Sequence, residues 1–572
     1  MADGKGAEVA ICHPPSAIVD WHDCRPRGGD PGRAIHACRV AVVRGDRVVD
    51  DIRDRYDRLV DLLEKIGQLF VVPARGDVER HVRENHVGGI IWFESTTQYA
   101  AQMNAHLQSI AKTPLLVSAD LESGMGMRFT DATWWPPPMA IAATGDPSFA
   151  EEMGRVTARE ALAIGVNHIL APVADVNVDP RNPVINTRSF GEDPHEVARY
   201  VAAFVRGVQS EGAPATAKHF PGHGDTHVDS HRALPVLDVT LERLNRVELV
   251  PFRAAIEAGV ASIMMGHLAV PSIDATPAPV RAEFENVYGT ARDEVTHGGA
   301  LPATVSPAII QLLRRDLGFG GLIITDSFDM GGLAAHFDPG EAAVRAIEAG
   351  EDQILFSADT DAAIAAVRDA VRGGRLSESR IDQSVERVMI AKSTVIPSGA
   401  RDLGGRGNAT RTPPPRSLAL ARDDIGAEFI AERAITLVRD DDQLLPLTQS
   451  VTAIVVTDFP EPNPIEIATR ELNAKRVIAI DATTEHVDVD DPIVLLLALR
   501  PKSGAGRIAL PKAAQALAKR NVIAVSFGSP YVLRDFRTAV CAYGIQPVLQ
   551  RAAIRAIRGE APMSGILPVT LG

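Results

Sequence analysis

Residues 321–326 read GLIITD, a short apolar run that ends in a carboxylate. Seven similar runs occur in the chain: GQLFVV (67–72), GGIIWF (88–93), PLLVSAD (114–120), HILAPV (168–173), ATAKHF (215–220), SIMMGH (262–267) and QILFSA (353–358). Helix-compatible segments, such as 149–164 and 194–210, separate several of them. Alternating strands and helices indicate parallel pairing. Eight such units predict a (β/α)8 TIM-like barrel, whose functional residues gather where the strands end.

Changes in composition divide the chain into four parts. Residues 1–55 are rich in Arg, Asp, Gly and Pro, which predicts a poorly ordered leader, and the barrel is expected over 56–392. Residues 393–417, dominated by Gly, Pro and Arg, are typical of a linker. Over 418–572 five further runs resemble buried strands alternating with helices: AITLVR, TAIVVT, RVIAID, PIVLLLAL and NVIAVSFG. They predict a smaller α/β sandwich domain.

Charge and hydropathy exclude several classes of function. The 572-residue chain carries a net charge of −14, which argues against a nucleic-acid partner. Its longest apolar run, IVLLLAL (493–499), is too short to span a bilayer, and residues 1–20 lack the apolar segment of a secretory signal. We therefore expect a cytoplasmic protein without a membrane partner. Four scattered cysteines (Cys12, Cys24, Cys38 and Cys541) form no disulfide framework.

Residues 218–231 read KHFPGHGDTHVDSH, in which histidines recur at every fourth position: His219, His223, His227 and His231. That spacing on a helix would suit zinc, but Pro221 and two glycines within the stretch oppose a helix. The chain also contains no H-x-H pair, which counts against a metal-dependent barrel hydrolase. We predict neither a metal ion nor a cofactor. An ordinary polar loop remains the alternative.

The end of this stretch carries a carboxylate and an imidazole two residues apart, Asp229 and His231. A carboxylate at that separation can orient the imidazole and stabilise its cationic form. The pair therefore predicts a general acid–base group that works near neutral pH.

KHFPGHGDTHVDSHRALP (218–235) resembles the signature of the β-N-acetylglucosaminidases among the family 3 glycoside hydrolases. The resemblance implies that Lys218 and His219 bind sugar and that the Asp-Ser-His triplet carries the acid–base residue, His231. Ordinary β-glucosidases of the family lack this triplet.

Three other segments extend the resemblance: ADLESGMGMRF (119–129), INTRSFGEDP (185–194) and the run that ends in GLIITDSFDM (321–330). They imply that Asp120 and Arg128 hold sugar hydroxyls, that Arg188 contacts substrate and that Asp326 is the catalytic nucleophile. The segment 432–447 and the closing GILPVTLG resemble the smaller C-terminal domain of two-domain members. Residues 276–300 look like an insertion beside the barrel mouth.

The residues themselves allow more than one interpretation of Asp326. It follows GLIIT, at the expected C-terminal end of a barrel strand, where catalytic groups lie. It could instead cap the next helix, and Asp329 is a competing carboxylate. Strand-end geometry favours Asp326 as the inward-facing group.

Together these features predict a retaining exo-glycosidase. It would remove terminal β-linked N-acetylglucosamine from peptidoglycan fragments or chitooligosaccharides, through a covalent glycosyl-enzyme on Asp326 and an Asp229–His231 acid–base pair. Three alternatives stay open: a β-glucosidase, a phosphorylase of the same fold, and a carbohydrate-binding protein without activity. In each case the partner is a carbohydrate, and the sequence does not indicate an oligomeric state.

Overall fold

The structure is a computed structural model that describes residues 61–281, 299–395, 418–459, 463–489, 492–502 and 508–571. All of them belong to one compact unit, Arg58–Gly572. The predicted leader (1–55), nearly all of the predicted linker (393–417) and most of the predicted insertion (276–300) lie outside the described residues.

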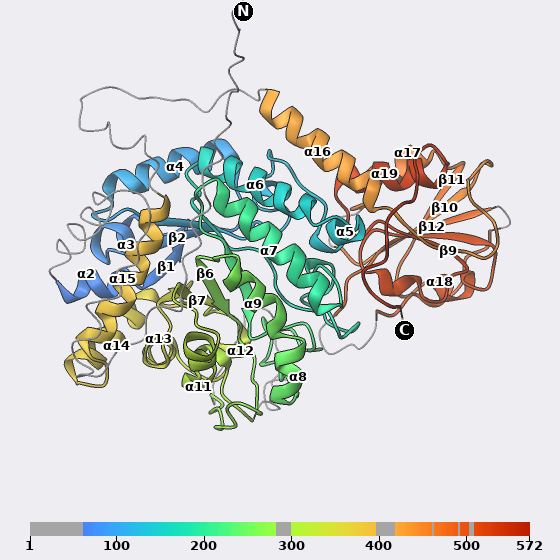
Figure 1. Cartoon of the computed structure of the whole chain (residues 1–572). Coiled ribbons are helices and arrows are strands. Elements are labelled where there is room, and N and C mark those ends of the chain that lie inside the picture. The colour runs from blue at the N-terminus through green and yellow to red at the C-terminus, as the bar shows by residue number, and fades with distance from the viewer. Residues whose placement is uncertain are drawn as a thin grey trace, which may run out of the picture. The chain divides into compact units, whose positions relative to one another are not determined.

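The first part of the chain forms the predicted barrel (Figure 1). Its eight parallel strands are β1 (Phe70–Pro73), β2 (Gly89–Trp92), β3 (Leu116–Ala119), β4 (His168–Ile169), β5 (Thr216–Phe220), β6 (Ser262–Met265), β7 (Leu322–Ser327) and β8 (Gln353–Leu355). The sheet runs in the order β4-β3-β2-β1-β8-β7-β6-β5. Its two edge strands meet through single bridges, Ile169 to Ala215 and Val173 to Lys218, which nearly close the barrel. Each of the eight predicted runs thus contributes one strand, although β4 is shorter than the six residues predicted.

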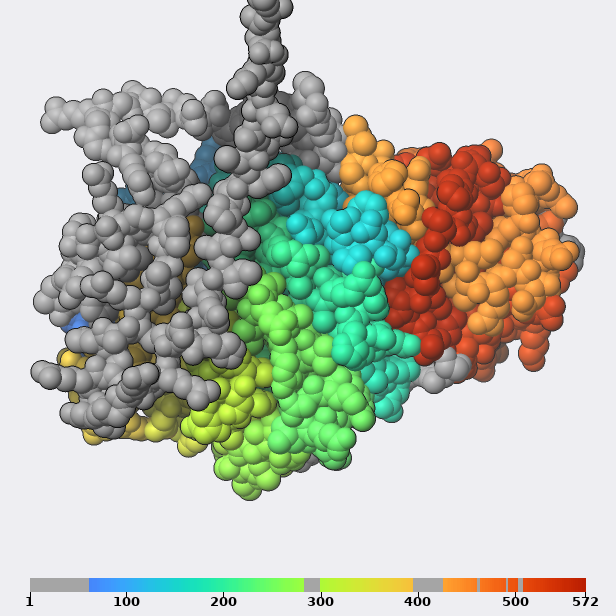
Figure 2. Space-filling view, viewed as in Figure 1, coloured from blue at the N-terminus to red at the C-terminus, as the bar shows by residue number. Residues whose placement is uncertain are grey.

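Helices cover the outside of the strands (Figure 1), and the cyan-to-green surface at the centre of the space-filling view belongs to the chain between about residues 140 and 260 (Figure 2). They are α2 (Leu62–Gly67), α3 (Val78–Glu84), α4 (Thr97–Ile110), α5 (Pro138–Ala143), α6 (Ser148–Ala163), α7 (Pro194–Ser210), α8 (Leu241–Arg246), α9 (Leu249–Glu257), α11 (Pro307–Gln311), α12 (Gly331–Ala334), α13 (Pro339–Ala349), α14 (Thr360–Arg372) and α15 (Glu378–Val395). No helix in the described part of the chain is long and apolar enough to cross a membrane.

The barrel interior explains why the strands are continuously apolar. One cluster of buried side chains comes from or directly follows six different strands: Val71, Ile91, Leu170, Met264, Ile324 and Leu355. Parallel strands are covered by helices outside and by these side chains inside, so both of their faces require apolar residues. The helices begin at local signals. At α7, for example, the Asp193 carboxylate accepts hydrogen bonds from the next two free amides and Pro194 occupies the first turn.

The second domain contains a six-stranded sheet in the order β11-β10-β12-β13-β14-β9. Its elements are α16 (Leu418–Ala434), β9 (Thr436–Asp440), β10 (Thr452–Thr457), α17 (Glu466–Leu472), β11 (Arg476–Ile480), β12 (Ile493–Ala498), α18 (Lys512–Leu517), β13 (Val522–Ser526), β14 (Thr538–Cys541) and α19 (Pro547–Ile557). Helices α17 and α19 lie on one side of the sheet and α18 on the other (Figure 1).

Two features of this sheet differ from the sequence prediction. Strand β14, only four residues long, was not predicted, and it pairs antiparallel with β9. The run RVIAID was predicted to be a buried strand, but most of β11 is exposed. The physical reason is position: β11 pairs only with β10 and forms the edge of the sheet.

The end of the barrel opposite the strand C-termini contains a buried acid, Glu351, directly before β8. Neither of its carboxyl oxygens has a hydrogen-bond partner among the described residues. Burial, assisted by the charge of Asp352, raises the pKa of Glu351 well above its usual value, despite Arg314 and Arg380 nearby. The folded protein therefore keeps a proton on Glu351 that the unfolded chain loses above pH ~4.3.

This difference between the folded and unfolded pKa of Glu351 predicts that the free energy of unfolding depends on pH. As the pH rises from the pKa of Glu351 in the unfolded chain toward its higher pKa in the folded protein, the free energy of unfolding should fall by up to about 1.4 kcal/mol per pH unit. Glu351→Gln should match the wild type at pH 4 and become progressively more stable than it toward pH 8, as measured by denaturant unfolding. Glu257→Gln, at an exposed site, is the control and should show no such trend. An advantage for Glu351→Gln that is the same at both pH values would contradict the prediction.

Candidate active site

The predicted site residues lie at the C-terminal ends of the barrel strands. Asp120 directly follows β3, Lys218 and His219 lie in the second half of β5, and Asp326 is the penultimate residue of β7. Arg188 lies in the loop after β4, and Asp229 and His231 lie in the loop after β5. These seven residues, from separate parts of the sequence, are thus brought to the same end of one barrel.

Four charged side chains and a fifth, Glu122, form a network of ion pairs. Lys218 Nζ lies 2.7 Å from both Asp120 Oδ1 and Glu122 Oε1. Arg128 donates to Asp120 Oδ2 at 2.9 Å, and Arg188 donates to both Glu122 oxygens at 2.8 Å through Nε and one terminal nitrogen. Arg128, Arg188 and Lys218 thus converge, and two carboxylates hold them together.

The network fixes its members in their charged forms. Burial raises the pKa of Asp120, but Lys218 and Arg128 outweigh it and lower that pKa to about 2. For Glu122, Arg188 and Lys218 likewise overcome burial and hold the pKa well below its usual range. Burial lowers the pKa of Lys218, but Asp120 and Glu122 raise it more. Glu122 was not predicted as a site residue. Its position two residues after Asp120, just beyond the end of β3, could have indicated that it lies near the same site.

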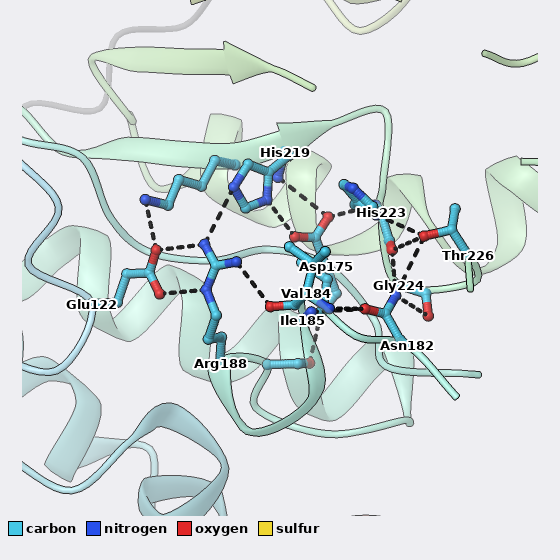
Figure 3. Close-up of polar contacts among 12 residues, drawn as sticks. Glu122, Asp175, Asn182, Val184, Ile185, Arg188, His219, His223, Gly224 and Thr226 are labelled. Atoms are coloured by element: carbon cyan, nitrogen blue, oxygen red, sulfur yellow. Dashed lines mark hydrogen bonds and ion pairs between the residues drawn. The ribbon is translucent and has the colours of Figure 1, made fainter. Parts of the chain in front are cut away.

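His219 is held by a second unpredicted carboxylate, Asp175, which follows β4 (Figure 3). His219 Nδ1 lies 2.7 Å from Asp175 Oδ2, and Nε2 lies 3.5 Å from a terminal nitrogen of Arg188. Asp175 Oδ1 accepts from the backbone amides of His219 and His223, at 3.2 and 2.6 Å. This single carboxylate therefore connects the ends of β4 and β5.

Asp229 and His231 form the predicted carboxylate–imidazole pair. Asp229 Oδ1 lies 2.9 Å from both His231 Nδ1 and the His231 backbone nitrogen. Burial lowers the pKa of His231, but the hydrogen bond and charge of Asp229, together with the charge of Asp326, raise it above the usual value. The imidazole is therefore more readily protonated than a free histidine, as a general acid requires.

The loop that carries this pair is attached to the segment that follows Asp326. The carbonyls of His231 and Ser230 accept hydrogen bonds from the amides of Gly331 and Gly332, each at 2.9 Å. A Cβ atom at position 332 would lie 3.0–3.1 Å from the carbonyls of His267 and Ser230, closer than an ordinary van der Waals contact, so glycine suits this close approach. The acid–base loop and the β7 loop are thereby fixed relative to each other.

Asp326 accepts a backbone hydrogen bond and lies near three imidazoles. Its Oδ1 accepts from the Ser327 amide at 2.8 Å. Burial raises the pKa of Asp326, but the imidazoles of His219, His267 and His231 and the Ser327 amide together lower it below the usual value. The carboxyl is therefore ionised near neutral pH, the form needed for nucleophilic attack.

The neighbours of Asp326 play different structural roles. The ring of His267 lies 2.9 Å from the Ser327 carbonyl through Nε2, so it donates there and supports the end of β7. The competing carboxylate, Asp329, accepts from the Ser327 hydroxyl at 2.7 Å. It therefore contributes to the shape of the loop.

The histidine-rich stretch is not a helix beyond β5, as predicted. His219 and His223 are buried, His231 is partly exposed and His227 is exposed. Within the described ranges, no three His, Cys, Asp or Glu side chains are arranged to hold a metal ion.

Comparisons with known proteins agree with this arrangement. Residues 61–391 match the glycosyl hydrolase family 3 N terminal domain. The chain belongs to glycosyl hydrolase family 3. A Cellulomonas fimi protein named beta-N-acetylglucosaminidase/beta-glucosidase is 31% identical over 543 residues, 88% of this chain and 93% of its own length. Beta-hexosaminidase A of Pseudoalteromonas piscicida is 33% identical over 393 residues, 64% of this chain and 62% of its own.

A solved structure agrees as well. The family 3 beta-N-acetylglucosaminidase from Paenibacillus sp. str. FPU-7 superposes with a TM-score of 0.75 at 31% identity, covering 90% of this chain and 99% of that one. The two-domain architecture of this family 3 protein is therefore shared with a relative over nearly its whole length.

In this family 3 chain, the second domain contacts the loop that carries Arg188. Asn177 donates to the Tyr531 hydroxyl at 3.0 Å, and the Glu192 amide donates to the Pro568 carbonyl at 3.2 Å. Both barrel residues belong to the segment between β4 and α7. The second domain thus supports a site-bearing loop, while the predicted site residues all come from the barrel.

Proposed function

We propose that this protein is a retaining exo-glycosidase that removes terminal β-linked N-acetylglucosamine. The observation that carries the proposal is the Asp229–His231 pair, held by two backbone hydrogen bonds to the loop that follows Asp326. The names of the similar proteins support the substrate class. Asp120, Arg128, Arg188, Lys218 and His219 are the proposed sugar-binding residues.

In the first step, Asp326 attacks the anomeric carbon while His231 gives its proton to the leaving oxygen. Asp326 Oδ1 is occupied by the Ser327 amide, so we assign the attack to Oδ2. The products are a covalent glycosyl-enzyme and the released alcohol. Retaining glycosidases usually employ two carboxyl groups for these roles, so a histidine acid is the unusual element.

In the second step, water attacks the anomeric carbon, His231 accepts a proton from the water, and the bond to Asp326 breaks to release the sugar and the free carboxylate. Glycosylation of Asp326 removes a negative charge that had raised the pKa of His231. The imidazole therefore becomes easier to deprotonate once the intermediate forms, and the same residue can act first as acid and then as base. Asp229 keeps the ring oriented throughout.

The finer substrate proposal is a fragment of peptidoglycan. A histidine acid–base group does not repel an anionic aglycone as a second carboxylate would, and peptidoglycan fragments carry such anionic groups. Chitooligosaccharides are the uncharged alternative. The cytoplasmic location inferred from the sequence remains a prediction.

Nitrophenyl glycosides test the substrate class. We expect kcat/KM for the β-N-acetylglucosaminide to exceed that for the β-glucoside by at least about tenfold, a difference of ~1.4 kcal/mol in transition-state binding. The same assay on a muropeptide and on chitobiose tests the finer proposal, with faster release of N-acetylglucosamine expected from the muropeptide. Equal rates would leave the charge argument without support.

One alternative has a specific observation behind it. The Cellulomonas fimi relative is named for both activities, so a β-glucosidase is the second candidate. A preference for the nitrophenyl glucoside would establish it and would contradict our substrate assignment. Adding phosphate to the same assays examines the phosphorylase alternative, which a sugar-1-phosphate product would reveal.

A further inference from the structure

The contacts of Asp175 go beyond what is needed to support a loop. Its side chain is fully buried, and its two oxygens make different bonds. Oδ1 accepts from two backbone amides, those of His219 and His223, whereas Oδ2 contacts only the His219 ring among the residues that the structure describes. One oxygen thus binds two backbone amides and the other binds the ring of His219 (Figure 3).

The partners of His219 define which ring nitrogen carries hydrogen. A carboxylate only accepts, so His219 Nδ1, 2.7 Å from Asp175 Oδ2, must donate. A guanidinium only donates, so His219 Nε2, 3.5 Å from Arg188, is the accepting atom of that contact. For the neutral ring, this geometry selects the Nδ1–H tautomer and leaves Nε2 as an acceptor on the side of Arg188.

We propose that Asp175 is a positioning residue that sets the tautomer of His219, so that Nε2, whose contact with Arg188 is long at 3.5 Å, exchanges that contact for a hydrogen bond from a sugar hydroxyl. The proposal rests on the sugar-binding role of His219 proposed above and adds the direction of the bond and the residue that controls it. The site then contains two carboxylate–imidazole pairs with different duties. Asp229–His231 transfers a proton, whereas Asp175–His219 holds one in place.

Asparagine at position 175 separates the two functions of the carboxylate. The amides of His219 and His223 cannot change their polarity, so the asparagine oxygen must face them and its NH2 group must face His219 Nδ1. The ring then has to accept at Nδ1 and carry its hydrogen on Nε2. Asp175→Asn should thus preserve the loop but reverse the tautomer, which turns Nε2 into a donor that opposes Arg188.

The expected loss follows from the role of the ring. Reversing a tautomer at a histidine that itself transfers the proton costs about 10⁴-fold in a serine protease triad. His219 is proposed only to bind, so we expect Asp175→Asn to weaken binding of N-acetylglucosamine and lower kcat/KM roughly 10–100-fold. The same substitution in a His219→Gln background should add little, because the affected ring is already gone.

A matched control lies four residues along the same loop. The Asp179 carboxylate is also largely buried, but its bonds go to Arg181. Asp179→Asn makes the same chemical change without touching a histidine, and should keep kcat/KM within about twofold of the wild type. Asp175→Ala is less informative, because it leaves two buried amides without an acceptor and destabilises the loop directly.

The decisive experiment is nitrogen NMR of histidine-labelled wild-type and Asp175→Asn protein, with His219 assigned from the spectrum of His219→Gln. We expect the hydrogen-bearing nitrogen of His219 to change from Nδ1 to Nε2, with Tm nearly unchanged. An unchanged tautomer, or a reversed tautomer with wild-type affinity for N-acetylglucosamine, would overturn the proposal. The spectra and the sugar titration require no turnover, so a failure of the proposed hydrolysis would be seen separately.

Discussion

Asp326→Ala should leave no measurable hydrolysis of any glycoside, a loss in kcat of at least ~10⁴-fold, because no covalent intermediate can form. The effect should be independent of the leaving group, since every substrate must pass through attack by this carboxylate. Activity is measured with a nitrophenyl and a dinitrophenyl N-acetylglucosaminide. The variant should still bind N-acetylglucosamine, because the network of Asp120, Glu122 and Lys218 is untouched.

Chemical trapping identifies the carboxylate directly. A 5-fluoro glycosyl fluoride should accumulate as an ester on the wild-type enzyme, and peptide mapping should place it on Asp326. Asp329→Ala is the control. It should be labelled on Asp326 as the wild type is, because the Asp329 carboxylate bonds to the Ser327 hydroxyl and is not the proposed nucleophile. A label on Asp329 would contradict the assignment, and absence of any label would point to assistance by the acetamido group of the substrate.

The barrel was predictable because its strands carry the same signal eight times. The strands are buried on both faces, so their runs are continuously apolar, and two of the runs end in a carboxylate. Those carboxylates are Asp120 after β3 and Asp326 near the end of β7. In the second domain the expectation of burial failed for β11, which lies exposed at an edge. The buried strand β14 was missed, although it is as long as several of the predicted barrel strands.

The residues that hold the site together were harder to predict than those proposed to perform the chemistry. Asp175 lies 44 positions before His219, and the two meet only because the barrel closes between β4 and β5. Within APVADVNVDP nothing distinguishes Asp175 from Asp179, although one binds a histidine and the other binds Arg181. Partner choice of this kind depends on three-dimensional proximity that local patterns do not encode.

These supporting carboxylates also determine which charges remain available to substrate. Lys218 and Arg188 are both paired with Glu122, so they are fixed in position before a sugar arrives. Fixed donors lose little conformational entropy on binding and favour one orientation of the ring. The free energy of that arrangement depends on Glu122, because removing it would take away the carboxylate paired with Arg188 and leave Lys218 with Asp120 alone.

His231→Ala should reduce activity by an amount that depends on the leaving group. The variant lacks only proton transfer, a contribution of typically ~10²–10⁴-fold. A dinitrophenyl group leaves without protonation, so Asp326 should still be glycosylated and the intermediate should accumulate as a burst. Sugar alcohols leave poorly without a proton, so hydrolysis of chitobiose should nearly vanish. His227→Ala, at an exposed histidine of the same loop, is the control and should behave as wild type.

Azide completes the test of His231, because it is a nucleophile that requires no general base. It should restore turnover of the dinitrophenyl substrate by the His231→Ala enzyme and yield the β-glycosyl azide, with retained configuration. Asp229→Ala should show the same pattern in a milder form, since it loses the 2.9 Å contact that orients the ring but keeps the imidazole. Equal damage to good and poor leaving groups, with no burst and no azide product, would show that His231 shapes the loop or binds sugar. The acid–base role would then have to belong to another group within reach of the leaving oxygen.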